Sequence, residues 1–436
     1  MSLINTFVLN CIILVYIFIS GCATRIGPEL TDNEFSEKPT STEGKVLSGR
    51  MVDGSFKLGL ALSGGGFRSA SYSIGAMKGL YDAGVLQDVD IISAVSGGSY
   101  AAYWLLNNEV ASTGGALGDS VFSDLPGDNR FIVNACRLTA TANFVTVGDM
   151  LTNICRQSDM YQEEIESSFG AYKNSVSEAS IQSYRPHVES GKIPYFVFNA
   201  TLIDDDLKLK SGNKKHHEIY NGWVNGLYEM TPFHLGNDGF GYEPWKDEPF
   251  RLSRASAISG AAIHDSLFVS LSQDIESQHE DTLLNEKIRL SDGGHSENLG
   301  AIALIKRGVK NIILVDAEMD SRLTFEGYYI LKDRLHAHGW TLENELLDSR
   351  QRNYSDKKDD EFWARKARPE IQNGEFIARV KSSDGETIST IYYIKMSIVG
   401  SLKREMEDDY FALTKHLKES GIDENAKIRG YLDSNK

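Results

Sequence analysis

The sequence has 436 residues, of which 41% are hydrophobic and 10% aromatic, enough to bury the core of one large domain or two smaller ones. Its 61 acidic residues outnumber its 45 basic residues, and the formal net charge of -16 argues against a nucleic-acid partner. No dense cluster of lysine and arginine is present, so the charge pattern does not indicate docking on anionic lipid either.

Residues 1–21 have the features of a secretion signal. Residues 3–19 are mostly apolar but too short for a typical membrane-spanning helix, and small residues follow them. The stretch ISGC at residues 19–22 resembles a bacterial lipobox, which implies cleavage before Cys22 and attachment of lipid to its thiol. An ordinary cleaved signal, or a membrane anchor in which Cys22 is incidental, is the alternative.

The lipobox reading predicts a lipoprotein of the bacterial cell envelope. Ala23 stands where inner-membrane retention is associated with Asp, which favours the outer membrane. Residues 22–50 are polar and lack apolar periodicity, so we expect a flexible tether between the lipid anchor and the folded part. Residues 51–436 then form the folded domain, within which residues 109–192 are a possible cap or insertion.

Two of the four cysteines remain once Cys11 is assigned to the signal and Cys22 to the lipobox. An exported compartment permits a disulfide between Cys136 and Cys155, and two buried free thiols fit the sequence equally well. Neither cysteine has a partner at the usual spacing of a metal site.

Three consecutive glycines, Gly64, Gly65 and Gly66, follow an apolar run at residues 57–62. Apolar residues then recur at three- and four-residue steps over residues 67–81, which predicts an amphipathic helix. A strand-to-helix turn of this kind presents free N–H groups to an anion, aided by the helix dipole. The sequence lacks the Lys-Ser/Thr of a nucleotide-binding loop and the last glycine of a dinucleotide fingerprint, which leaves an oxyanion or a turn without chemical role.

A second turn lies about thirty residues downstream, at Ser96. The β-rich residues 89–95 precede it, and residues 100–106 are apolar on nearly every side. A strand, a sharp serine turn and a buried helix are typical of a nucleophile elbow with Ser96 at its apex. Ala94 replaces the first glycine of the G-x-S-x-G pattern, and Gly98 keeps the second.

A serine hydroxyl needs a base to take its proton. Among the ten histidines, His336, His338 and His416 lie on charged, helix-like stretches that we expect to be solvated. The stronger candidate for the base is a carboxylate, Asp292.

Asp292 ends a strand-like stretch at residues 288–292 and is followed by two glycines. A helix predicted over residues 297–305 and a strand over residues 311–316 complete a β-α-β unit, which would place Asp292 at the carboxyl edge of an open sheet. A turn-forming Asp-Gly pair without chemical role is the alternative.

Three motifs resemble, in chain order, those of the patatin-like phospholipases and the related cytosolic phospholipase A branch: GGGFR at residues 64–68, VSGGS at residues 95–99 and DGG at residues 292–294. The segment SDGGHSENLG at residues 291–300 also resembles a stretch of the bacterial members. The resemblance implies an α/β fold of three layers, α/β/α, with a central, mostly parallel sheet, a nucleophile elbow and a Ser-Asp dyad.

Residues 194–201 and 254–262 are similar to further segments of the same family, and the resemblance extends over residues 55–320. Beyond it, strand-like residues 377–380 and 391–394 flank a Ser-Asp-Gly-Glu turn, which predicts a hairpin.

The resemblance implies a role for each matching residue. Ser96 would attack the ester carbonyl, Asp292 would accept its proton, and the N–H groups of the three glycines would hold the oxyanion. Arg68 would pair with the phosphate of the lipid, the alternative being a structural salt bridge. No cofactor and no metal is required, and Asp204-Asp205-Asp206 lacks the glycine and glutamate of an EF-hand.

The expected function is that of an acyl hydrolase that cleaves phospholipids or lysophospholipids through an acyl-Ser96 intermediate, tethered beside its membrane substrate through Cys22. Two alternatives share the same fold. One is an acyltransferase that passes the acyl chain from Ser96 to another acceptor, and the other is a non-catalytic scaffold of the envelope. The sequence leaves the acyl position, the head group, the orientation of the domain and the oligomeric state open.

Overall fold

The structure is a computed structural model. It describes residues 56–113, 122, 158–169, 179–203, 226–237, 241–245, 249–261, 273–276, 287–318, 325–345, 347–348 and 377–396. The expected signal (1–21), Cys22, the tether (22–50), Cys136, Cys155 and His416 lie outside these residues, as does much of the possible cap. Those expectations remain predictions.

The described strands form a mixed sheet of twelve strands with parallel strands at its centre. The main order is β10-β11-β12-β9-β1-β2-β3-β4-β5-β6, and β7 and β8 join through β3. The strands are β1 (Leu58–Leu62), β2 (Ile91–Val95), β3 (Tyr195–Ile203), β4 (Leu227–Met230), β5 (His234–Asn237), β6 (Gly241–Pro244), β7 (Gln273–Glu276), β8 (Lys287–Asp292), β9 (Asn311–Asp316), β10 (Thr341–Glu343), β11 (Ile377–Lys381) and β12 (Thr387–Lys395).

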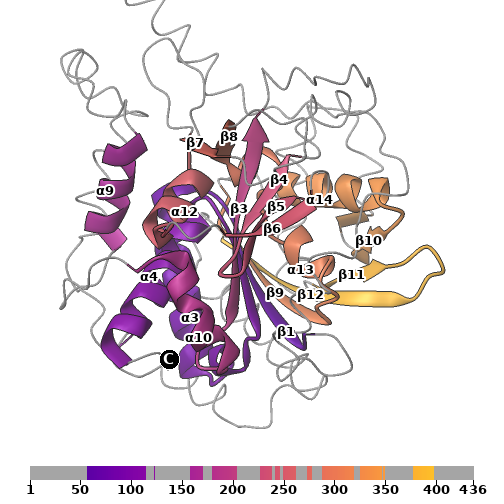
Figure 1. Ribbon diagram of the computed structural model, residues 1–436. Helices are drawn as coiled ribbons and strands as arrows, with labels where there is room; N and C mark the ends of the chain where they lie inside the picture. The colour runs from indigo at the N-terminus through magenta and orange to yellow at the C-terminus, as the bar shows by residue number, and fades with distance from the viewer. Residues whose placement is uncertain are drawn as a thin grey trace, which may run out of the picture.

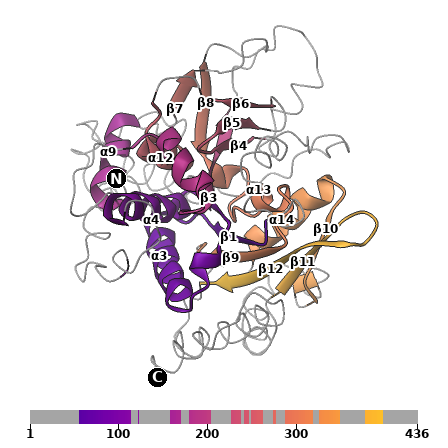
Figure 2. The same ribbon diagram turned by 60° about the horizontal axis from the view of Figure 1, so that its bottom comes forward.

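Five neighbouring strands, β12, β9, β1, β2 and β3, run parallel, and the strands added at either end are antiparallel. Figure 2 shows the β11–β12 hairpin and strands β7 and β8 at opposite ends of this sheet. Strands β1 and β2 consist of buried residues throughout, because helices cover both faces of the central sheet. The predicted α/β class with central parallel strands between helices is confirmed.

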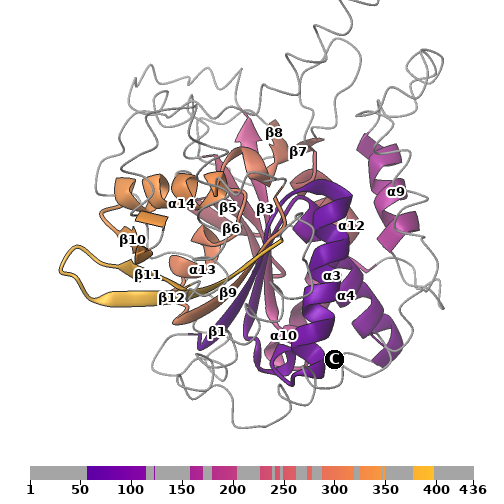
Figure 3. The same cartoon turned by 180° about the vertical axis from the view of Figure 1, so that it is seen from behind.

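The described helices lie in two layers, one on each side of the sheet. They are α3 (Gly66–Asp82), α4 (Gly97–Thr113), α9 (Ser158–Phe169), α10 (Arg185–Glu189), α12 (Leu252–Ser259), α13 (Ile302–Ile305) and α14 (Glu326–Ala337), with short 3-10 turns η1 (Leu86–Asp88), η2 (Ile181–Tyr184) and η3 (Gly293–His295). Helices α3, α4, α9 and α12 lie on one side and α13 and α14 on the other (Figure 1 and, from behind, Figure 3). None of the helices in the described ranges is long and apolar enough to cross a membrane.

The two helices that follow the motif turns differ in how they are buried. Helix α3 buries Ala70, Ile74 and Met77 at the three- and four-residue spacing of an amphipathic helix. In α4 every residue from Tyr100 to Leu106 is buried. Both helices and the β11–β12 hairpin confirm predictions made from the sequence.

The prediction of a β-α-β unit around Asp292 is wrong in two respects. Strand β8 pairs antiparallel with β3 and β7, whereas β9 pairs in parallel with β1 and β12, so β8 and β9 are not parallel neighbours. The predicted helix over residues 297–305 begins only at Ile302. The buried carboxylate of Glu297 accepts the N–H groups of Leu299 (2.6 Å) and Ile302 (3.2 Å), so it caps the helix rather than forming its first turn.

Candidate functional site

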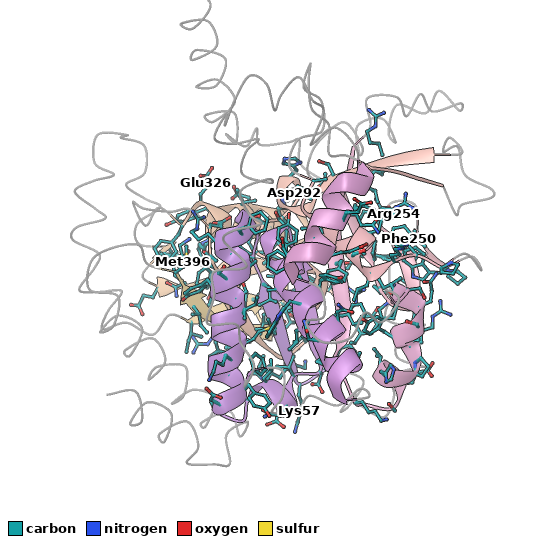
Figure 4. All side chains as sticks on the ribbon, turned by 90° about the vertical axis from the view of Figure 1, so that its left-hand side faces the viewer. Lys57, Phe250, Arg254, Asp292, Glu326 and Met396 are labelled. Carbon is teal, nitrogen blue, oxygen red and sulfur yellow. The ribbon has the colours of Figure 1, made fainter. Side chains whose placement is uncertain are left out.

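The serine turn and the aspartate turn meet because two strands end on the same edge of β3. Strand β2 is parallel to β3 and ends with Val95 opposite Asn199. Strand β8 is antiparallel to β3 and ends with Asp292 opposite Ala200, while β4 occupies the other edge of β3 at these positions. The carboxyl ends of β2 and β8 therefore point toward one another. In Figure 4, Asp292 lies at the opposite end of the sheet from Lys57, which precedes β1.

Ser96 occupies a sharp turn between β2 and α4. Its φ of 50° is one of two positive values found among the described non-glycine residues, and it costs backbone energy that neighbouring contacts must offset. The next two residues are crowded by the glycine turn and the end of β1. A Cβ on Gly97 would lie 2.0 Å from the Gly66 carbonyl oxygen, and a Cβ on Gly98 would lie 2.3 Å from that of Leu62. Only glycine fits at either position.

The Ser96 Oγ donates a hydrogen bond of 2.6 Å to Asp292 Oδ2. The other carboxylate oxygen, Oδ1, accepts the Gly294 N–H at 2.7 Å. Both residues are only 6% exposed, and burial raises the pKa of the Asp292 carboxyl. The charge of His295 and the hydrogen bonds from Ser96 and Gly294 lower the pKa, but burial has the larger effect. The arrangement can move a proton from the serine hydroxyl to the carboxylate.

The glycine turn packs directly against this pair, but its three amides are not equivalent. The Gly64 N–H donates to the Asn298 carbonyl oxygen at 2.8 Å, so it is not free to hold an oxyanion as the sequence reading expected. No hydrogen bond from the Gly65 or Gly66 N–H to a described residue is found. Gly65 (φ 135°) and Gly66 (φ 65°) have backbone conformations that favour glycine, and a Cβ on Gly66 would meet open space.

Arg68 lies on the first turn of α3 and reaches the segment that follows β9. Its Nη2 donates to the Ala317 carbonyl oxygen at 3.2 Å, and its buried Nε has no partner among the described residues. Burial lowers the pKa of the guanidinium, while the nearby carboxylates of Asp316 and Glu318 raise it. No ion pair of Arg68 with a described residue is found within 4.0 Å, so the structural salt bridge is not observed in this part of the chain.

Two residues at the site had no role in the sequence reading. Ser259, at the end of α12, accepts the Ser96 N–H at 2.9 Å. Asn298 donates to Glu318 Oε1 at 2.5 Å while its carbonyl holds Gly64, so it joins the aspartate loop to the glycine turn. The only signal for either residue was its place in a segment that resembles the family.

The two described histidines considered as bases lie on α14 or just after it. His336 is exposed, as expected. His338 is partly buried rather than solvated, and burial together with Lys306 and Arg334 lowers its pKa to about 4. Within the described ranges, no group of three or more His, Cys, Asp or Glu residues could hold a metal ion.

Residues 60–166 match the model of a protein family described as Patatin-like phospholipase. The matched stretch contains the glycine turn and Ser96, and ends before Asp292. A search of curated protein sequences finds no match.

Solved structures similar to this one include human GIVD cytosolic phospholipase A2, with a TM-score of 0.47 and 13% identity over 77% of this chain and 55% of that chain. Its complex with Methyl gamma-Linolenyl Fluorophosphonate has a TM-score of 0.44 and 12% identity, over 90% and 62% of the two chains. VipD from Legionella pneumophila has a TM-score of 0.31 and 12% identity, over 87% and 67%. The chain thus spans about half the length of the first of these proteins.

Proposed function

We propose that the protein is a serine hydrolase that cleaves fatty acyl esters of phospholipids or lysophospholipids through an acyl-Ser96 intermediate. The observation that carries the proposal is the hydrogen bond of 2.6 Å between Ser96 Oγ and Asp292 Oδ2. A carboxylate with a raised pKa is a better proton acceptor than an ordinary one, and it lies within reach of the hydroxyl. The family matched by residues 60–166 supports a lipid ester as the substrate.

In the proposed reaction, Ser96 Oγ attacks the ester carbonyl carbon as its proton passes to Asp292. The bond to the alcohol oxygen breaks, and the alcohol leaves with the proton from Asp292. Water then attacks the acyl-serine and gives a proton to Asp292, the fatty acid leaves, and Ser96 regains its proton. These steps consume one ester and one water and yield one alcohol and one fatty acid.

The proposed oxyanion donors are the N–H groups of Gly65 and Gly66, since that of Gly64 is bonded to Asn298. Removal of one such donor typically lowers kcat by a factor of about 10²–10³. The proposed role of Arg68 is to bind the phosphate of the substrate. The support for this role is the place of Arg68 on the first turn of α3, two residues after Gly66, together with the planar, bidentate donor geometry of a guanidinium.

The proposed location is the bacterial cell envelope, with lipid on Cys22 anchoring the chain to the outer membrane beside its substrate. The support is the ISGC stretch at residues 19–22 together with Ala23. The mass of the mature N-terminal peptide tests it, because processing at a lipobox leaves a lipidated cysteine as the first residue.

The test of the proposed activity uses the full chain in detergent, a p-nitrophenyl ester and a fluorophosphonate that labels activated serines. We expect ester hydrolysis by the wild type, label on the peptide that contains Ser96, and loss of both in Ser96→Ala. Ser71→Ala, on the exposed face of α3, is the matched control and should behave as wild type. Label on another serine, or full hydrolysis by Ser96→Ala, would contradict the proposal.

A further inference from the structure

The carboxyl end of helix α12 holds both members of the Ser96–Asp292 pair. The Ser259 hydroxyl accepts the N–H of Ser96 at 2.9 Å and donates to the Asn199 carbonyl oxygen of β3 at 2.6 Å. Two residues further, the Ala261 carbonyl oxygen accepts the N–H of Asp292 at 3.0 Å. It also accepts the hydroxyl of Ser291 at 2.6 Å. Ser259 therefore bonds to the turn of the serine, and Ala261 bonds to the end of β8.

This segment is fixed in place by α4, the helix that begins just after Ser96. Ser259 and Ala261 have no exposed surface. A Cβ on Gly260, between them, would lie 1.8 Å from the Tyr100 hydroxyl oxygen, so the backbone of the segment is in direct contact with α4. Because α4 begins immediately after Ser96, the segment and the serine turn cannot shift independently of one another.

Ser96 needs such a restraint because its backbone is in the left-handed region, with φ of 50°. Serine adopts this conformation only when surrounding contacts impose it. The hydrogen bond to Ser259 fixes the direction of the Ser96 N–H and therefore the orientation of the turn. It also occupies that N–H, which leaves oxyanion binding to other donors.

We propose that Ser259 is a positioning residue, which holds the strained turn of Ser96 so that its Oγ stays within hydrogen-bond distance of Asp292. This inference rests on the proposed function, since it assigns Ser259 to the acylation step of that reaction. Ser259 lies within residues 254–262, which are similar to a segment of the family but had no predicted role.

The test compares Ser259→Ala with wild type in the full chain, using p-nitrophenyl butyrate hydrolysis and the rate of reaction with a fluorophosphonate. We expect kcat and the rate constant of labelling to fall about tenfold, the size of effect that a lost buried hydrogen bond gives. The KM and the final label per chain should stay near the wild-type values, because the acyl site and the fold are retained. A merely structural role would lower the final label per chain and leave the rate constant of the remaining sites unchanged.

Ser253→Ala is the matched control. Ser253 is buried on the same helix, and its hydroxyl bonds to Glu166 Oε1 of α9 at 2.8 Å instead of to the serine turn. Its rate constant of labelling should equal that of wild type. If Ser259→Ala does not fold, Ser259→Cys keeps a γ atom at this position, although sulfur is larger than oxygen and a weaker acceptor, and an intermediate loss of rate is expected.

Two results would overturn the proposal. A wild-type rate constant in Ser259→Ala, or in Ser259→Cys where the alanine variant does not fold, would show that the hydrogen bond does not position the nucleophile. Absence of both hydrolysis and Ser96 labelling in the wild type would refute the proposed function, and the role of Ser259 with it. The second result is seen in the unmodified protein, so the two failures are distinguishable.

Discussion

Ser96 and Asp292 are 196 positions apart in the chain, yet the hydroxyl of one donates to the carboxylate of the other at 2.6 Å. The contact depends on strand direction. Strand β2 runs with β3 and β8 runs against it, so that their last residues, Val95 and Asp292, face adjacent positions of β3. Had β8 run parallel to β3, its carboxyl end would point away from the serine turn.

The first prediction concerns pH. Asp292 must be ionised to accept the proton of Ser96, and burial raises the pKa of its carboxyl above the ordinary value of about 3.9. We therefore expect kcat/KM for an ester to fall as the pH drops through a value above 3.9. The pH profile of hydrolysis measures this directly. An acidic limb centred at or below the ordinary aspartate value would contradict the prediction.

The second prediction concerns stability. The native state holds the Asp292 proton more tightly than the unfolded chain does, so stability falls as pH rises from the unfolded pKa through the folded pKa. Asp292→Asn removes the buried charge, and its amide oxygen can still accept the Gly294 N–H. We expect the variant to unfold at a higher temperature than wild type at pH 7.

The advantage of Asp292→Asn should disappear below about pH 3.9, where both states of the wild type are protonated. Thermal unfolding of both proteins at the two pH values shows which of them is the more stable at each pH. A variant that is less stable than wild type at pH 7 would show that the carboxylate stabilises the fold.

The third prediction concerns the glycine turn. A Cβ on Gly65 would lie 2.7 Å from the Ala317 carbonyl oxygen, and φ of 135° is unfavourable for alanine. Gly65→Ala should therefore lower the free energy of unfolding by about 1–3 kcal/mol and also reduce ester hydrolysis. Denaturant titration measures the first effect.

Gly75→Ala is the matched control for the glycine turn. Gly75 lies in the interior of α3, and a Cβ there would meet nothing within 4 Å. The variant should stabilise the protein by about 0.5–1 kcal/mol and leave activity unchanged. Equal effects of the two substitutions would mean that the turn does not require glycine at position 65.

The fourth prediction distinguishes the two roles considered for Arg68. If its guanidinium binds phosphate, Arg68→Gln should lower kcat/KM for a phospholipid about tenfold or more and change p-nitrophenyl butyrate hydrolysis little, because that ester has no phosphate. Parallel assays on the two substrates give the comparison. Equal losses on both would instead indicate that Arg68 supports the segment after β9 through its bond to Ala317.

The strands and helices around the motif turns could be predicted because their signals are local. The apolar run before the glycines and the one before Ser96 are short, buried strands. Each is followed by a helix, amphipathic in α3 and buried at every residue from 100 to 106 in α4. The direction of β8 has no such signal, since it is determined by pairing with β3, far away in the sequence. The sequence pattern at Asp292 therefore predicted the end of the strand but not its antiparallel orientation.

The candidate site, too, could be predicted only where its signals are local. The serine and aspartate turns are visible as Ser-Gly-Gly and Asp-Gly-Gly, whereas the use of the Gly64 N–H depends on the carbonyl of Asn298, which reaches it only in the folded chain. The hydroxyl of Ser259 is one of several on α12, and no local pattern distinguishes it from Ser253 or Ser256. Such contacts are tertiary and cannot be derived from periodicity.

The most direct test of the proposed Ser96–Asp292 mechanism is fatty acid release from vesicles of mixed phospholipid and lysophospholipid by the full chain, comparing wild type with Ser96→Ala and Asp292→Asn. We expect release by the wild type and a loss of at least about 10²-fold in each variant, while circular dichroism shows that both stay folded. Release by a folded Ser96→Ala or Asp292→Asn variant at the wild-type rate, or no release by folded wild type, would contradict this mechanism.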